Sequence, residues 1–151
     1  MDSGKRAVAT LIVAAIGTYG PALASHAPAE GPLAVGAQVY SVHCASCHGA
    51  DLEGQPDWQR SEPDGTLRAP PHDDTGHTWH HPGALLVDYV TLGGAETLRR
   101  LGVTGIASGM PAFGGVLSGD EIDAVLDYIA SHWSEQMRAY QAEVTRQAEG
   151  N

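Results

Sequence analysis

The stretch Cys44-Ala45-Ser46-Cys47-His48 decides the fold of this chain. It places two thiols three residues apart and an imidazole directly after the second, which is the pattern of covalent c-type haem attachment. The spacing suits that chemistry, because two thioether bonds must reach the two vinyl groups on one edge of a porphyrin while the next residue turns under the iron. Cys44 and Cys47 are therefore predicted to anchor one haem c, and His48 to ligate its iron.

Three other uses of the cysteine pair fit the surrounding sequence less well. A thioredoxin-like redox couple requires a preceding strand within a βαβ pattern, which is not evident here. A zinc site would have to recruit histidines at no familiar spacing, since the chain contains only these two cysteines. A disulfide between Cys44 and Cys47 would suit an exported protein, but it would brace very little chain.

The beginning of the chain has the features of a secretory signal. Lys5 and Arg6 precede an apolar run over residues 7–16, and Ala22 and Ala24 supply the small residues of a cleavage site. Because the run is shorter than the roughly 20 residues that span a bilayer, cleavage after Ala24 and export to the periplasm are expected. A membrane anchor is the alternative if the signal is not cleaved. Export agrees with the haem prediction, since bacteria attach c-type haem outside the cytoplasmic membrane.

The remainder of the chain, residues 25–151, is strongly acidic. It holds six arginines, no lysine and seventeen Asp or Glu residues, a formal charge of about −11 with His neutral. Such a surface does not steer toward acidic partners, and it argues against nucleic acid or anionic membrane as a target. We expect a partner with a basic docking surface, and no stable membrane insertion after signal cleavage. An acidic balance also keeps an exported protein soluble.

A helix is predicted to lead into the cysteine motif. Beginning at Leu33, the residues Val35, Val39 and Val42 are spaced to share one helical face. Gly36 is costly inside a helix, so its presence indicates that another helix approaches closely at this point.

The partner of this helix is predicted near the end of the chain. Ser118 and Glu121 form a capping box, in which each side chain satisfies the backbone amide of the other residue. An apolar stripe with helical spacing follows, made of Ile122, Val125, Leu126, Ile129 and Trp133. A thinner stripe continues through the polar tail, with Met137, Tyr140 and Val144.

A long loop and a further helix lie between these two elements. Residues 49–78 are rich in Pro, Gly and Asp and hold hardly any apolar residue, so no long regular element fits. Pro82 opens a helix that runs to about Leu92 and ends at Gly93, and residues 96–101 add a further turn. The sequence shows no β pattern and no internal repeat, so the predicted fold class is all-α.

The chain is predicted to divide into a signal peptide (1–24), a flexible leading segment (25–32), one domain (33–134) and a C-terminal helical extension or tail (135–151). A domain with so much loop would bury too little apolar surface to offset its chain entropy. A centrally placed haem would supply the missing apolar interior, so folding is expected to depend on it.

A second iron ligand is predicted at Met110, in an apolar turn just before the last helix. Its thioether would bind low-spin iron, and Pro111 would stiffen the loop. A core-filling role is the plainer alternative for this side chain. Met137 is a rival ligand, but it lies on a helix that leads away from the pocket. Ligation by a second histidine is the remaining alternative.

One set of residues matches a known pattern. It consists of Gly36, Tyr40, Cys44, Cys47, His48, Met110, Pro111 and the capped helix that ends at Trp133. Together these resemble the bacterial class I cytochromes c, which are monohaem electron carriers of the periplasm. The resemblance covers nearly all of the chain after the signal. It implies a cytochrome c fold of three to five helices around one covalent haem, with the first and last helices crossing near Gly36.

The resemblance also implies roles for individual residues. Met110 would be the distal ligand, and a proline carbonyl, that of Pro70 or Pro71, would accept a hydrogen bond from the His48 ring. The long loop over residues 49–78 departs from the family pattern.

A histidine-rich tract over residues 71–82 reads P-H-D-D-T-G-H-T-W-H-H-P. His77 with His80 or His81 could bind copper or zinc, since imidazole suits both metals. Trp79 or a histidine could instead line the haem pocket and donate to its propionates. The tract could also form only polar turns before the next helix. A similar stretch, P-P-H-D-x-T-G-H-T-W-H-H, occurs in a subset of the cytochromes that the chain resembles.

The predicted function is one-electron transfer by an outer-sphere route, without enzymatic activity. With His48 and Met110 both bound to the iron, no substrate could bind at the metal, and the thioether would favour the ferrous state. Redox protein partners are expected. Two other functions remain open, a peroxidase-like enzyme with an open sixth position and a copper- or zinc-binding role through residues 72–81.

Overall fold

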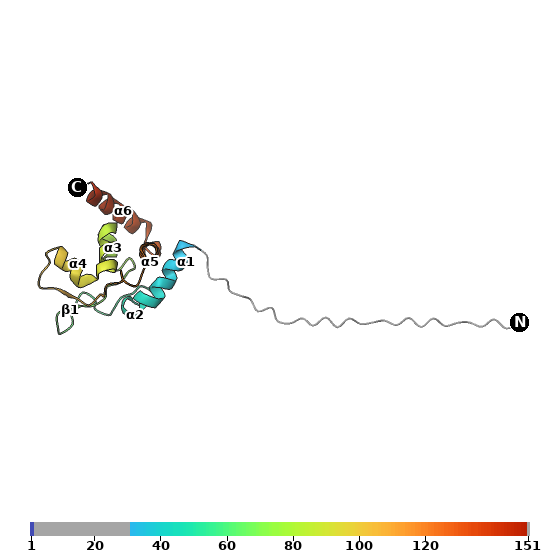
Figure 1. The fold of residues 1–151 in the computed structure, drawn as a ribbon, viewed down its shortest axis with the longest axis horizontal. Helices are drawn as coiled ribbons and strands as arrows, with labels where there is room; N and C mark the ends of the chain where they lie inside the picture. Colours follow the sequence, from blue (N-terminus) through green and yellow to red (C-terminus); the bar gives the residue numbers. More distant parts are fainter. Residues whose placement is uncertain (2–30, 151) are drawn as a thin grey trace.

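Helices make up most of the chain that the structure describes, which is Met1 and residues 31–150 of a computed structural model. The predicted signal peptide and nearly all of the leading segment lie outside the described residues. The elements, drawn in Figure 1, are α1 (Pro32–Val39), the π-helical turn η1 (Tyr40–Cys44), α2 (Ala45–His48), β1 (Thr66–Leu67), the 3-10 turn η2 (Thr78–His80), α3 (Gly83–Leu92), α4 (Gly94–Arg100), β2 (Ala107–Ser108), α5 (Gly119–Ser131) and α6 (Glu135–Glu149). The prediction of an all-α architecture is confirmed.

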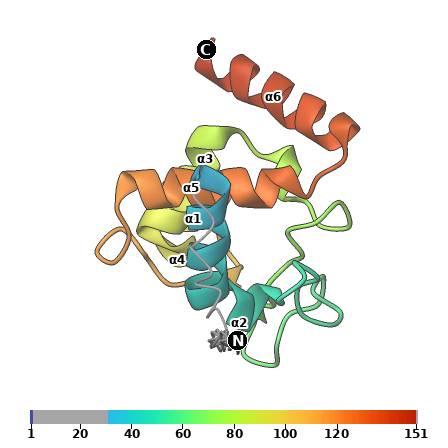
Figure 2. The same ribbon diagram turned by 90° about the vertical axis from the view of Figure 1, so that its right-hand side faces the viewer.

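The crossing of α1 over α5 is the central contact of the fold, and Figure 2 shows the two helices at a steep angle. A Cβ atom on Gly36 would lie 2.0 Å from the carbonyl oxygen of Ala124 and 2.7 Å from Cβ of Tyr128. No side chain fits in that space. The close approach predicted from Gly36 is therefore confirmed, and α5 is the helix that makes it.

The buried face of α1 differs from the predicted one. Val39 and Tyr40 are only 6% and 2% exposed, whereas Val35 and Val42 are 44% and 65% exposed. With Gly36 facing α5, the residues three and four positions later share its face, so the inward stripe runs through Gly36, Val39 and Tyr40. The π turn after Val39 then shifts the helical register, which leaves Val42 outside.

The hydrophobic core lies mainly between α1, α3 and α5. The predicted capping box is confirmed at the start of α5: the Glu121 amide donates to Ser118 Oγ at 3.3 Å, and the Ser118 amide donates to Glu121 Oε2 at 2.9 Å. Helix α3 also matches its prediction, with Pro82 as the N-cap. The core residues are Val39, Tyr40, Leu52, Leu86, Val90, Leu117, Ile122, Val125, Ile129 and Trp133.

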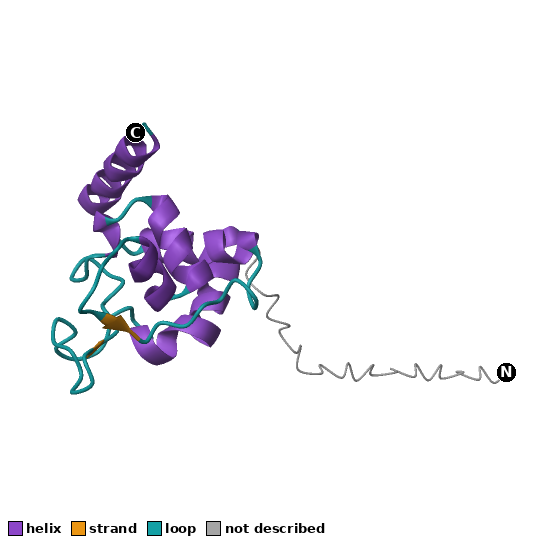
Figure 3. Ribbon diagram, turned by 60° about the vertical axis from the view of Figure 1, so that its left-hand side comes forward, coloured by secondary structure: helices purple, strands orange, loops and turns teal. Residues whose placement is uncertain are grey.

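Two very short strands were not predicted from the sequence. Strand β1 pairs in parallel with β2, Thr66 opposite Ala107 and Leu67 opposite Ser108. Strands of two residues are too short to show the alternation by which strands are recognised. The rest of the loop over residues 49–78 carries no long regular element, as predicted, and Figure 3 draws it in teal with the other loops.

Helix α6 lies to one side of the other helices (Figure 2). The Gly83 amide at the start of α3 donates to Thr145 Oγ1 on α6 at 3.0 Å. The rings of Trp79 and His80 both lie 5.6 Å from the ring of Tyr140. Among the described residues, no helix combines the length and apolar character needed to cross a membrane.

Replacing Gly36 should weaken the α1–α5 crossing. We expect Gly36→Ala to lower the free energy of unfolding by about 2 kcal/mol, because the new methyl group must displace the backbone of α5. Chemical denaturation of the purified protein would measure the change. Gly119→Ala is the matched control, since nothing lies within 4 Å of a Cβ at that position. Equal stability of the two variants would contradict the close-packing argument.

Candidate functional site

The Cys44–His48 motif lies at the end of three successive helical elements, α1, η1 and α2. The turn η1 ends at Cys44, α2 ends at His48, and Gly49 leaves the helix with a φ of +83°. The hydroxyl of Tyr40 reaches down this short helix and donates to the Gly49 carbonyl at 3.0 Å. Cys44 is half-buried, Cys47 is exposed and His48 is buried. The motif thus follows directly after α1, with its imidazole turned inward.

The orientation of the His48 ring is set by one hydrogen bond. Nδ1 lies 2.8 Å from the carbonyl oxygen of Pro70. Because a carbonyl only accepts, Nδ1 must carry the proton, and Nε2 keeps a free lone pair. Of the two prolines considered for this contact, Pro70 makes it. Burial lowers the pKa of His48, and the bond to Pro70 only partly offsets that effect, so the neutral form that can bind a metal is favoured.

The loop after the motif brings Pro70 to this position through backbone contacts. The Gly54 amide donates to the His48 carbonyl at 2.7 Å, and the Gln55 amide donates to the Ala69 carbonyl at 2.9 Å. Gly54 has a φ of +70°, and a Cβ there would lie 2.4 Å from the Pro71 nitrogen. These bonds bring the two ends of the segment over residues 55–69 together, next to His48.

The thiols are not arranged as a reactive redox pair. Burial, followed by the neighbouring Cys47, raises the pKa of Cys44 to about 11. Redox-active C-x-x-C motifs depend on a lowered pKa, which supplies the thiolate. Both thiols are free in the structure. These observations do not favour the thioredoxin-like or disulfide interpretations of the motif.

A second histidine ring lies directly against His48. The centroids of His48 and His72 are 4.0 Å apart and their planes differ by 29°, which is a face-to-face stack. A ring stacked against His48 would lie on the same side of a haem that His48 holds, so this arrangement does not favour His72 as the second ligand of a bis-histidine site. The contact between His72 and His48 was not predicted from the sequence. The one sequence feature that points to it is that His72 directly follows Pro70 and Pro71.

The Met110 loop is fastened to the end of α3. The Gly94 amide donates to the Met110 carbonyl at 3.0 Å, and the Phe113 amide donates to the Val90 carbonyl at 2.9 Å. Gly93, with a φ of +79°, allows this approach, because a Cβ there would lie 2.8 Å from the Ala112 nitrogen. Met110 is partly buried against the hydrophobic core. Its side chain thus projects from a loop that is held at both ends.

The histidine-rich tract is occupied largely by contacts between rings. His77 stacks on Trp58 with centroids 5.1 Å apart and lies 5.3 Å from His81, whereas His80 contacts Trp79 at 3.7 Å. Within residues 31–150, no group of three His, Cys, Asp or Glu side chains could hold a metal ion. His77, His80 and His81 do not form such a group, and the copper or zinc site at these residues stays a prediction.

Two buried nitrogens of the tract have no hydrogen-bond partner within the described part of the chain, His77 Nδ1 and Trp79 Nε1. Leaving a buried donor unpaired costs about 1–3 kcal/mol. The free Trp79 N–H is compatible with an acceptor that the polypeptide itself does not supply. Its predicted role beside the haem propionates stays a prediction.

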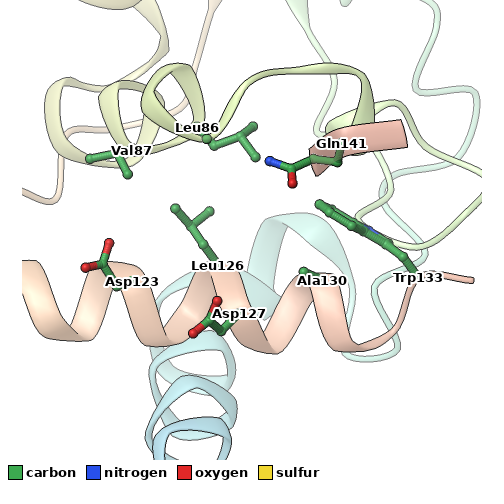
Figure 4. A pocket seen from close by; sticks show the side chains of 9 residues that line it. Leu86, Val87, Asp123, Leu126, Asp127, Ala130, Trp133 and Gln141 are labelled. Atoms are coloured by element: carbon green, nitrogen blue, oxygen red, sulfur yellow. The ribbon is translucent and has the colours of Figure 1, made fainter. Parts of the chain in front are cut away.

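A groove of about 380 Å³ lies between α3, α5 and α6, apart from the cysteine motif. Figure 4 shows Leu86 and Val87 of α3 opposite Leu126 of α5, with Asp123 and Asp127 on the same helix. Neither His48 nor Met110 is among the residues that line it.

Comparison with known protein families places most of the chain in one of them. Residues 31–129 match the model of the protein family described as cytochrome C oxidase, cbb3-type, subunit III. The matched region begins just before α1 and ends within α5, so it includes the Cys44–His48 motif and Met110. No curated protein and no solved structure matches the chain.

Proposed function

We propose that this chain, which belongs to the cytochrome c oxidase, cbb3-type, subunit III family, is a periplasmic electron carrier whose haem iron is held by His48 and Met110. Membership of the family establishes the all-α cytochrome c fold, a covalently bound haem c and a role in haem-based electron transfer. It also supports an electron carrier rather than an enzyme, although the family is named for a subunit of an oxidase. When bound, haem c supplies a one-electron iron couple.

The hydrogen bond between His48 and Pro70 is the observation that carries the proposal. Histidines that ligate metals almost always donate their other ring N–H to a carbonyl or carboxylate, which fixes the tautomer and the ring orientation. His48 has this arrangement, with Nδ1 at 2.8 Å from the Pro70 oxygen and Nε2 free. Cys44 ends the turn η1, and Cys47 lies one turn further on, in α2 next to His48. These residues fit a haem attached by two thioethers and ligated by His48.

Met110 is the proposed second ligand. The backbone of its loop is bonded to the start of α4, where the Gly94 amide donates to the Met110 carbonyl, and to α3, where the Phe113 amide donates to the Val90 carbonyl. The polypeptide therefore positions this loop without support from a ligand. If His48 and Met110 both held the iron, no substrate would bind at the metal, and electron transfer would follow an outer-sphere route. A thioether ligand also favours the ferrous state.

Removing the Met110 thioether should change the spectrum of the ferric protein. We expect Met110→Ala to lose the near-infrared charge-transfer band between thioether sulfur and iron completely, while Met137→Ala keeps it, because Met137 lies on α6. Near-infrared absorption of both variants measures this. A band that persists in Met110→Ala would refute this ligand. Strong peroxide turnover by the wild-type protein would favour the peroxidase-like alternative.

The intact mass of the purified protein tests both export and haem attachment. When the chain is expressed with its residues 1–24 in a bacterium that attaches haem c, we expect the periplasmic fraction to contain a chain that begins at Ser25 and carries one haem. Replacing Cys44 and Cys47 together by Ala should abolish the covalent haem, because both thioether bonds are lost. Intact-mass spectrometry measures both results. A chain retaining residues 1–24 would contradict signal cleavage, and haem removable by acid extraction would contradict covalent attachment.

The partner is proposed to present a basic docking surface. Residues 25–151 carry a formal charge of about −11. A surface with a strong net charge raises the rate of encounter with partners of the opposite charge. The charge would therefore favour cationic partners at low ionic strength.

Salt should act in opposite directions on cationic and anionic electron acceptors or donors. We expect the rate of electron exchange with a cationic ruthenium ammine complex to fall by roughly tenfold as salt rises from low to physiological concentration, because ions screen the attraction. Stopped-flow absorption of the haem measures this rate. Ferricyanide is the anionic control, and its rate should rise. A rate with the cationic complex that is independent of salt would contradict the proposed docking.

A further inference from the structure

We propose that His72 is a positioning residue that holds the plane of the His48 ring. This inference rests on the proposed function, in which His48 ligates the iron. The two rings lie face to face, with centroids 4.0 Å apart and planes 29° apart. The hydrogen bond to Pro70 restrains the ring at Nδ1 only. A carbonyl oxygen accepts over a broad range of directions, so that bond alone leaves the ring free to tilt, and contact with a flat neighbour removes this freedom.

His72 can serve as a fixed wall because its own position is held at several points. Its Nδ1 lies 3.0 Å from Thr78 Oγ1, and its amide donates to the Leu52 carbonyl at 2.8 Å. Its carbonyl accepts from Trp133 Nε1 at 2.7 Å. The ring of Tyr40 meets the His72 ring edge-on, with centroids 6.1 Å apart. Two contacts to the ring and two to the backbone, all from separate parts of the chain, thus restrain this residue.

The arrangement connects the end of α5 to the metal ligand. Trp133 is buried just after α5 and holds the His72 backbone, while the His72 ring covers the face of His48. Residues outside the direct ligands commonly orient the ligands and tune the metal. A leucine at position 72 would fill a similar volume, but it would present no flat face to the imidazole.

Electron paramagnetic resonance of the ferric protein tests this role, because the g-values of low-spin haem depend on the plane of the axial imidazole. We expect His72→Phe to keep the wild-type g-values, since it retains a flat ring. We expect His72→Leu to shift and broaden the signal, because the His48 plane becomes variable. His132→Leu is the control, because His132 is an exposed histidine whose ring contacts the ring of Tyr128 and not that of His48.

The outcomes separate this inference from the function on which it rests. A wild-type protein without the thioether-to-iron band, or without a low-spin signal, would refute the proposed ligation itself. If that ligation is present, unchanged g-values in His72→Leu, or equal shifts in the Phe and Leu variants, would overturn the positioning role. Should His72→Leu fail to fold, Thr78→Val removes the hydrogen bond to the ring, and we expect a smaller shift with broadening. No change in that variant would overturn the proposal as well.

Discussion

The hydrogen bond from His48 to the carbonyl of Pro70 is the constraint on which the site depends. It connects the end of a short helix to the far end of a loop that has few apolar residues of its own. The loop is drawn to this point by backbone bonds on either side, from Gly54 to His48 and from Gln55 to Ala69. With Nδ1 committed to Pro70, only Nε2 is left to meet a metal. A long and irregular segment therefore sets the chemistry of one nitrogen atom.

The helical frame supplies the rigidity that this arrangement requires. Gly36 lets α1 lie against the backbone of α5, and Val39 and Tyr40 fill the next turn of the same face. Tyr40 then does two things, because its hydroxyl braces the turn at Gly49 while its ring lies edge-on to His72. Tyr40 thus contributes both to the packing of α1 and to the surroundings of His48. Helix α6 adds a further support, through contacts with η2 and with the start of α3.

An electron carrier benefits from this rigidity. If both iron ligands are held by the polypeptide, little rearrangement accompanies a change of charge, and the transfer needs no substrate site. His48 is held by Pro70 and covered by His72, and the Met110 loop is joined to α3. The acidic surface acts separately, since it affects the encounter with a partner and not the ligands. The histidine-rich tract belongs largely to the frame, because its rings contact one another, Trp58 and α6.

The features that could be predicted from the sequence are those encoded by residues close together in the chain. The C-x-x-C-H motif, the capping box at Ser118 and the glycine that admits a second helix each depend on a few neighbouring residues. Tertiary structure alone selected Pro70 over its neighbour, exposed Val35 and Val42, and paired β1 with β2. It also placed His72 on His48. The physical reason is that these contacts join segments distant in sequence, where no local periodicity records which partner will be met.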